Sequence, residues 1–132
     1  MLSLGMDIGT STVKLVLLRD GAMAKRWMAV HHGRPFACLK KGLSALELDA
    51  DTPFSLCVTG SNTEALLEQD SAIPSLGDIP AVVEGVRQIV PQAGSVIEIG
   101  SQGARFITDL QSRAPQFAVN EHCAGGTGSF FE

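Results

Sequence analysis

Apolar and polar residues alternate along the first part of the chain, which is the pattern of half-buried β-strands. Residues 4–8 alternate apolar with small or acidic side chains, and residues 13–18 form a second apolar run. Asp20-Gly21 is a two-residue hairpin signal, and residues 22–32 predict a third strand. The chain is therefore expected to open with three antiparallel strands.

The middle of the chain changes to helical spacing. Apolar residues recur three and four positions apart at Phe36, Leu39, Leu43 and Leu46, which predicts an amphipathic helix. Residues 55–59 predict a short buried strand.

Capping signals precede two further helices. The run from Ser61 to Glu64 matches a capping box, and Asp78 can cap a helix that Pro91 and Gly94 end. The apolar face predicted for this last helix consists of Ile79, Val82, Val83, Val86, Ile89 and Val90.

The order of elements then begins again. Residues 95–99, 105–110 and 117–120 predict three strands separated by polar turns. The chain reaches Glu132 in what reads as a first helical turn after a Gly-rich segment. We therefore expect the chain to be a fragment of a longer protein.

Composition adds limits on partners and compartment. The 132 residues carry a net charge of −4, which gives no reason to expect nucleic acid or an anionic membrane as partner. No apolar run approaches the length of a membrane span. An odd number of cysteines, 3, without a secretion signal predicts a reducing, cytoplasmic location.

An internal repeat is the strongest signal in the sequence. Residues 7–15 align without gaps on residues 98–106, and acid, Ile, Gly, hydroxyl, base and apolar residue recur in the same order. Glycine lets a backbone approach a phosphate closely, and turn amides can form an anion-binding nest. Two such hairpins facing each other would hold phosphates from both sides; the alternative is a pair of ordinary tight hairpins.

Residues 7–12 resemble the first phosphate motif of the superfamily of acetate and sugar kinases, Hsp70 chaperones and actin, and residues 98–105 resemble its second. The resemblance implies an α/β fold of ribonuclease-H-like lobes, each a mixed sheet with helices, and ATP in the cleft. Residues 1–94 would form the first lobe and 95–132 the truncated start of the second. The P-loop and Rossmann glycine patterns are absent from the sequence.

The resemblance also assigns roles. Asp7 and Gln102 would be catalytic, and Asp7 would hold Mg²⁺, in our reading through water. The phosphate-binding residues would be Gly9, Thr10, Ser11, Thr12, Lys14, Gly100, Ser101 and Gln102.

A cysteine motif narrows the resemblance. Residues 120–132 read Asn-Glu-His-Cys-Ala-Gly-Gly-Thr-Gly-Ser-Phe-Phe-Glu, which closely resembles Asn-Asp-Lys-Cys-Ala-Ala-Gly-Thr-Gly-Arg-Phe-Leu-Glu of 2-hydroxyacyl-CoA dehydratase activators and benzoyl-CoA reductase ATPase subunits. A helix N-terminus after Cys123 would favour its thiolate, the form that ligates metal. The alternative is a free structural cysteine.

Cysteine arithmetic limits what this chain can build. A four-iron cluster normally takes four thiolates, and neither Cys38 on a helix nor Cys57 in a core strand is an expected partner for Cys123. The resemblance implies a [4Fe–4S] cluster between the subunits of a homodimer, with two ligands from each. The second cysteine would fall beyond Glu132, so this chain alone would not complete the site.

In this family, ATP hydrolysis drives a low-potential electron from the cluster into a separate dehydratase or reductase acting on a CoA thioester. The resemblance therefore implies ATP, Mg²⁺ and the cluster as cofactors, and a ferredoxin- or flavodoxin-like electron donor. Two alternatives stay open, a phosphotransferase of the sugar or acetate kinase type and a non-catalytic nucleotide-binding module. The isolated chain is expected to lack ATPase activity.

One departure from the family pattern bears on hydrolysis. Activators usually read Gly-Gly-Gln-Asp before Ala/Ser-Lys, whereas this chain has Gly103 in place of the Asp and Arg105 in place of the Lys. Loss of that carboxylate would slow hydrolysis or indicate an altered role. Elsewhere, His31 and His32 are adjacent and would point to opposite faces of a strand, so we expect exposed strand-end histidines and no metal site.

Overall fold

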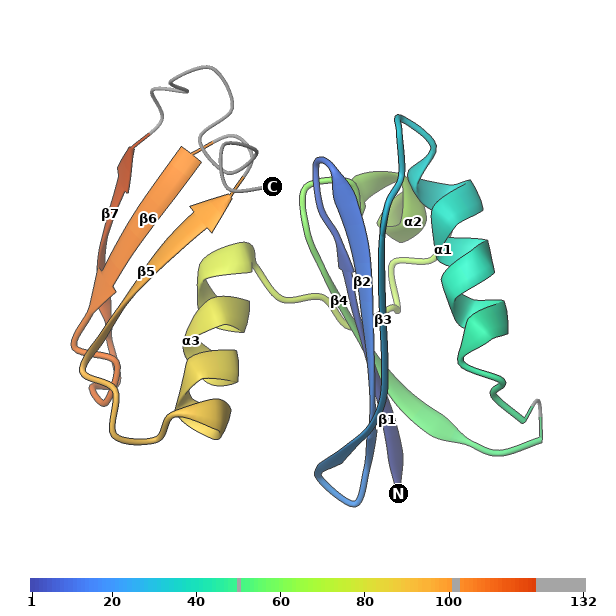
Figure 1. The fold of residues 1–132 in the computed structure, drawn as a ribbon, viewed down its shortest axis with the longest axis horizontal. Helices are drawn as coiled ribbons and strands as arrows, with labels where there is room; N and C mark the ends of the chain where they lie inside the picture. The colour runs from blue at the N-terminus through green and yellow to red at the C-terminus, as the bar shows by residue number, and fades with distance from the viewer. Residues whose placement is uncertain (50, 101–102, 121–132) are drawn as a thin grey trace. The chain divides into compact units, whose positions relative to one another are not determined.

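The computed structural model describes residues 1–49, 51–100 and 103–120, which belong to two compact units, Met1–Asp78 and Ile79–Glu132. Figure 1 labels their helices and strands. The division at residue 78 differs from the expected boundary at residue 94. The helix that precedes residue 94 packs its apolar face on the second sheet, which places it with the second unit.

The first unit is a four-stranded mixed sheet in the order β3-β2-β1-β4. The first three strands pair antiparallel, and β4 pairs parallel with β1. Its elements are β1 (Leu2–Ile8), β2 (Thr12–Arg19), β3 (Ala22–Val30), α1 (Pro35–Ala45), β4 (Phe54–Thr59) and α2 (Glu64–Gln69).

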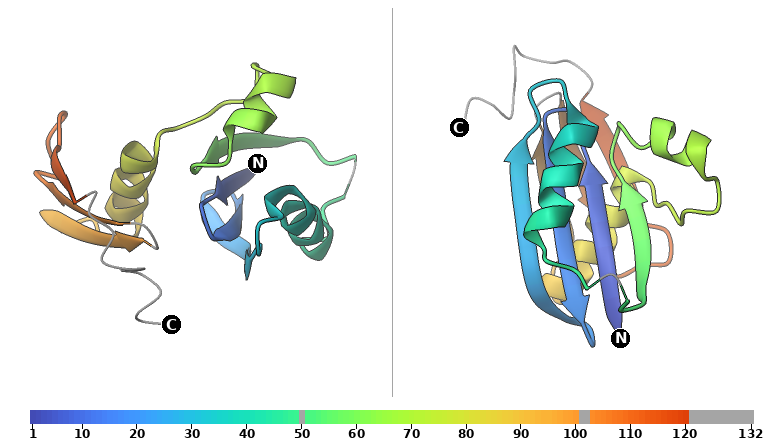
Figure 2. Two further views of the ribbon diagram at one scale, coloured as in Figure 1. Left: turned by 90° about the horizontal axis from the view of Figure 1, so that it is seen from above. Right: turned by 90° about the vertical axis from the view of Figure 1, so that its right-hand side faces the viewer.

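Strand alternation places the core of the first unit on one face of its sheet. The buried side chains of β1 and β2 are every second residue, so they all point to the side that α1 covers (Figure 2). Asp20 and Gly21 both have positive φ, as the predicted two-residue hairpin turn requires. The three-strand opening is therefore confirmed.

Helix α1 lies close to the sheet because it carries a glycine at the contact. A Cβ atom on Gly42 would lie 2.5 Å from the Trp27 ring and 2.7 Å from Leu15 Cδ1. The predicted apolar residues of this helix, Leu39 and Leu43, pack in the same cluster. Close approach of α1 thus depends on the missing side chain at residue 42.

The second unit is an antiparallel sheet in the order β5-β6-β7 with helix α3 on one face. Val83 of α3 is buried with Ile107 and Leu110. Arg87 donates from Nε to the Leu110 carbonyl at 2.6 Å, which ties the helix to the end of β6. Its elements are α3 (Asp78–Ile89), β5 (Ser95–Gly100), β6 (Gly103–Thr108) and β7 (Gln116–Asn120).

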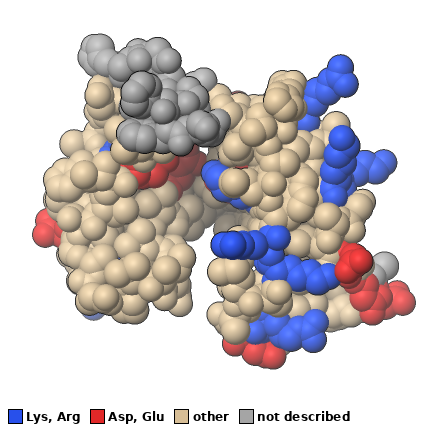
Figure 3. Space-filling view, viewed as in Figure 1, with Lys and Arg blue, Asp and Glu red and all other residues tan. Residues whose placement is uncertain are grey.

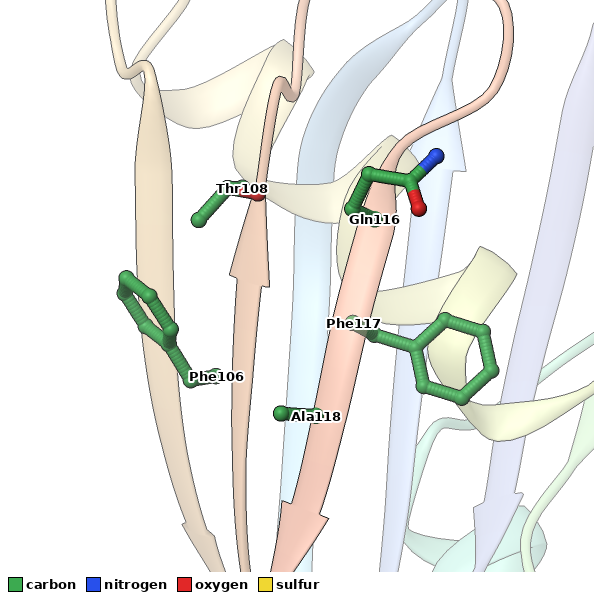
Figure 4. A pocket seen from close by; sticks show the side chains of 5 residues that line it. All are labelled: Phe106, Thr108, Gln116, Phe117 and Ala118. Carbon is green, nitrogen blue, oxygen red and sulfur yellow. The ribbon is translucent and has the colours of Figure 1, made fainter.

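The opposite face of the second sheet is apolar and exposed. Ile97, Ile99 and Phe106 are exposed there, and the side of this unit visible in Figure 3 is mostly uncharged. A shallow hollow lies over β6 and β7 (Figure 4). Phe106 and Phe117, which both line it, point to opposite faces of the sheet. Its lining carries no charged group, so it does not suit a phosphate.

Three local expectations were wrong. Helix α2 begins at Glu64 after Thr63, so Ser61 is not its cap. Ile89 is 78% exposed, beyond the end of the contact between α3 and the sheet. Cys57 is exposed on the outer face of β4, because its neighbour Val58 takes the inward position.

Within the described ranges, no helix is long and apolar enough to cross a membrane.

Candidate phosphate-binding site

The candidate site is the turn between β1 and β2. The Gly9 amide donates to the Thr12 carbonyl at 2.9 Å, which closes a tight loop containing Thr10 and Ser11. A Cβ atom on Gly9 would lie 3.3 Å from the Thr12 carbonyl oxygen, so glycine suits this close turn. The predicted residues Gly9 to Thr12 therefore lie together at one end of the sheet.

The acid and the base of the first motif face each other across the strand pair. Asp7 and Lys14 are register partners, and Lys14 Nζ lies 2.7 Å from Asp7 Oδ2. Both side chains stay partly exposed, at 33% for Asp7 and 47% for Lys14. The pair leaves the ammonium group accessible beside the turn, where it could also meet a phosphate oxygen.

The second motif repeats this geometry. Glu98 and Arg105 are register partners in β5 and β6, and Arg105 Nη1 lies 3.1 Å from Glu98 Oε2. Gly100 pairs with Gly103 next to the turn. The repeated sequence thus corresponds to two hairpins with the same register.

A loop from β4 packs against the first hairpin, and sequence reasoning missed it. β1 and β4 run parallel, so residues 60–63 after β4 lie beside residues 9–11 after β1. Thr10 Oγ1 and Ser61 Oγ are 2.9 Å apart, and Asn62 Nδ2 donates to the Gly9 carbonyl at 2.7 Å. A polar run directly after an apolar strand was the available signal, and the capping-box interpretation obscured it.

Gly60 permits this close approach. It has a φ of +104°, and a Cβ atom there would lie 2.5 Å from the Ile8 carbonyl and 2.7 Å from Asp7 Oδ1. Its amide and the Thr59 hydroxyl both donate to Asp78 Oδ1, at 3.1 and 3.3 Å. The Asp78 carboxylate, which the sequence predicts as a helix cap, therefore fixes the loop beside the hairpin; it belongs to the first residue of α3.

The expectation for His31 was wrong. It follows β3, is only 9% exposed, and its Nε2 lies 3.2 Å from the Gly9 carbonyl oxygen. His32 is exposed with a φ of 47°. The turn after β3 directs His31 inward against the first hairpin, which strand alternation could not predict.

Gly103, which stands where the activator pattern has Asp, lies against β7. A Cβ atom on Gly103 would approach the Asn120 carbonyl oxygen to 2.8 Å, closer than real Cβ contacts allow. Strand pairing therefore excludes any side chain at this position in the described arrangement.

Several predicted site residues lie outside the described ranges, namely Ser101, Gln102 and Cys123. Of the other cysteines, Cys38 is buried in the first unit and Cys57 is exposed on β4. The described residues contain no group of three or more His, Cys, Asp or Glu side chains that could hold a metal ion.

Comparison with known proteins identifies the relationship. The activator of lactoyl-CoA dehydratase from Anaerotignum propionicum is 31% identical over 137 residues, which include 100% of this chain and 52% of the relative. The activator of 2-hydroxyisocaproyl-CoA dehydratase from Clostridium difficile, solved with bound ADPNP, superposes with a TM-score of 0.79 at 27% identity. The chain is similar to the dehydratase activators along its whole length. It has their actin-like ATPase fold, which confirms the predicted fold class.

Coverage of the activators is partial. That solved activator is matched over 98% of this chain and 49% of its own length, so the chain spans about half of the relatives that it matches. The uncharacterized protein YjiL from Escherichia coli K12 is 30% identical over 98% of this chain and 50% of its own length. No protein-family model matches this chain.

Proposed function

We propose that the chain is the nucleotide-binding part of an ATP-dependent activator that drives low-potential electron transfer to a 2-hydroxyacyl-CoA dehydratase or a related CoA-thioester reductase. The observation that carries this proposal is similarity to several activators over the whole chain, with two phosphate hairpins of matching register. The solved structure of a relative with bound ADPNP supports the proposal that this chain binds a nucleotide.

The first hairpin supplies the groups that a nucleotide needs. The Gly9–Thr12 turn would bind phosphate through backbone amides and the hydroxyls of Thr10 and Ser11. Lys14 would neutralise phosphate charge beside Asp7. The Asp7 carboxylate has the hard oxygen donors that Mg²⁺ prefers, so it fits a water-mediated magnesium contact.

The redox part of the proposal depends on Cys123 and lies outside the described ranges. Cys38 is buried in the first unit and Cys57 is exposed on β4; the family resemblance assigns neither to the cluster. A [4Fe–4S] cluster would supply one-electron transfer at low potential. Cys123 would provide one thiolate, with the remaining ligands from the rest of the protein and a second subunit in a reducing cytoplasm.

Gly103 favours a second candidate, a nucleotide-binding module with slow or no turnover. The carboxylate expected near the magnesium or the attacking water is missing, and a Cβ atom at Gly103 would lie 2.8 Å from the Asn120 carbonyl oxygen. This candidate predicts nucleotide binding without the hydrolysis that drives electron transfer.

Iron content and electron paramagnetic resonance of the full-length protein, purified without oxygen and reconstituted with iron and sulfide, test the redox role. We expect about four irons per dimer and a signal after dithionite reduction in wild type. Cys123→Ala should abolish both because it removes a ligand, whereas Cys57→Ala should keep them. An iron-free, silent wild type would leave only the nucleotide-binding candidates.

A further inference from the structure

The Gly9 carbonyl oxygen receives hydrogen bonds from two side chains outside its own hairpin. Asn62 Nδ2 donates to it at 2.7 Å from the loop after β4, and His31 Nε2 lies 3.2 Å away at the end of β3. Both contacts are part-buried. Two donors on one carbonyl fix its direction more firmly than one contact would.

The backbones of the same two residues hold the neighbouring peptide units. The Asn62 amide donates to the Ile8 carbonyl at 2.9 Å, and the His31 amide donates to the Ser11 carbonyl at 3.0 Å. Because β4 lies next to β1 and β3 lies next to β2, the hairpin is held by residues that follow both neighbouring strands (Figure 2). We call Asn62 and His31 the hairpin clamp.

The hydrogen bonds also determine which ring nitrogen of His31 carries the proton. The Gly33 amide donates to Nδ1 at 3.1 Å, so Nδ1 is an acceptor. In a neutral imidazole the proton then lies on Nε2, which donates to the Gly9 carbonyl. The residue is 9% exposed, so this arrangement is largely shielded from water.

When the direction of the Gly9 carbonyl group is fixed, the direction of the Thr10 amide group in the same peptide unit is fixed as well. In a planar trans peptide the C=O and N–H bonds point in opposite directions, and the described chain has no cis peptide. The Thr10 amide therefore points away from Asn62 and His31. Amide direction is the property that decides whether a turn can bind an anion.

We propose that Asn62 and His31 are positioning residues that hold the Gly9–Thr10 peptide with its amide directed at a nucleotide phosphate. This inference rests on the proposed nucleotide-binding function. Neither side chain contacts the nucleotide; each acts through the Gly9 carbonyl. Loss of either lets the peptide rotate, so affinity for phosphate falls even where the fold survives.

The affinity of the full-length protein for ADP, measured by calorimetry, tests the clamp. Asn62→Ala should weaken ADP binding by about tenfold, and His31→Ala by somewhat less because its contact is longer. His31→Gln should recover most of the loss, since a glutamine amide can donate from nearly the same position as Nε2. The double alanine variant should lose less than the product of the single effects, because both donors share one oxygen.

Ser55→Ala is the matched control. Its hydroxyl contacts Ser3 Oγ at 2.8 Å in the same β1–β4 pair but at the opposite end, so it should lower stability without changing ADP affinity. Unfolding midpoints are recorded for every variant. ADP affinity unchanged in Asn62→Ala and His31→Ala, whatever their midpoints, would overturn the clamp alone. A wild type that does not bind ADP or ATP would overturn both the clamp and the proposed function.

Discussion

At the residue scale, close backbone contacts explain positions that depart from a family pattern. Gly103 removes a carboxylate that the activator resemblance leads one to expect, and the departure reads from sequence as a loss of catalytic function. The structure adds a physical reason, because a Cβ atom at this position would lie only 2.8 Å from the Asn120 carbonyl oxygen of β7.

Restoring the family residue should therefore cost stability. Gly103→Asp and Gly103→Ala should each lower the free energy of unfolding by about 1–3 kcal/mol, because any Cβ atom forces β7 to shift. Gly94→Ala is the control, since nothing lies within 4 Å of its Cβ position. Urea denaturation of the full-length protein checks this, and a stable Gly103→Asp with raised ATPase activity would contradict it.

At the scale of elements, packing against the sheet stabilises helix α1 more than capping of its N-terminus does. No side-chain hydrogen bond caps its N-terminus, and its first turn has no acidic residue. Packing on β2 and β3 through Leu39 and Gly42 provides its stability instead.

Two helical glycines give a matched comparison of this packing. Gly42→Ala should lower the free energy of unfolding by about 1–3 kcal/mol, because the methyl group would overlap the Trp27 ring and Leu15. Gly85→Ala in α3 meets nothing within 4 Å and should raise the free energy of unfolding by up to about 1 kcal/mol through helix propensity. Thermal unfolding followed by circular dichroism measures both, and equal effects at the two positions would contradict the packing argument.

At the scale of the whole molecule, the repeat raises the question of whether both hairpins act on one nucleotide. Each carries a cross-strand ion pair between partly exposed groups, Asp7 with Lys14 and Glu98 with Arg105. Such pairs contribute only about 0–1 kcal/mol to stability. Replacing the basic partners, Lys14 and Arg105, should therefore have little effect on folding.

A double-mutant cycle on ADP affinity answers that question. Lys14→Gln and Arg105→Gln should each weaken ADP binding in the full-length protein, because each removes a positive charge that would lie near phosphate. If both contact the same phosphates, the cycle should show a coupling energy of about 0.5 kcal/mol or more. An ADP affinity that Arg105→Gln leaves unchanged would contradict this prediction and favour a site formed by the first hairpin alone.

The sequence by itself determined the elements, the repeat and the family resemblance. Strand alternation, helical spacing and the Asp20-Gly21 turn depend on neighbours within a few residues, so they can be read locally. It likewise predicted that Asp7 and Gly9 lie at a hairpin. It did not locate the hairpin clamp, and its local interpretations of Ser61 and His31 were wrong.

Only the tertiary structure decided which distant groups meet at that hairpin. Asn62 is 53 positions from Gly9, and the two meet because β4 pairs parallel with β1. His31 turns inward after β3, and Gly103 is confined by the β7 carbonyl of Asn120. Such contacts follow from strand order and register, which long-range packing of the whole sheet sets and which no local pattern of residues encodes.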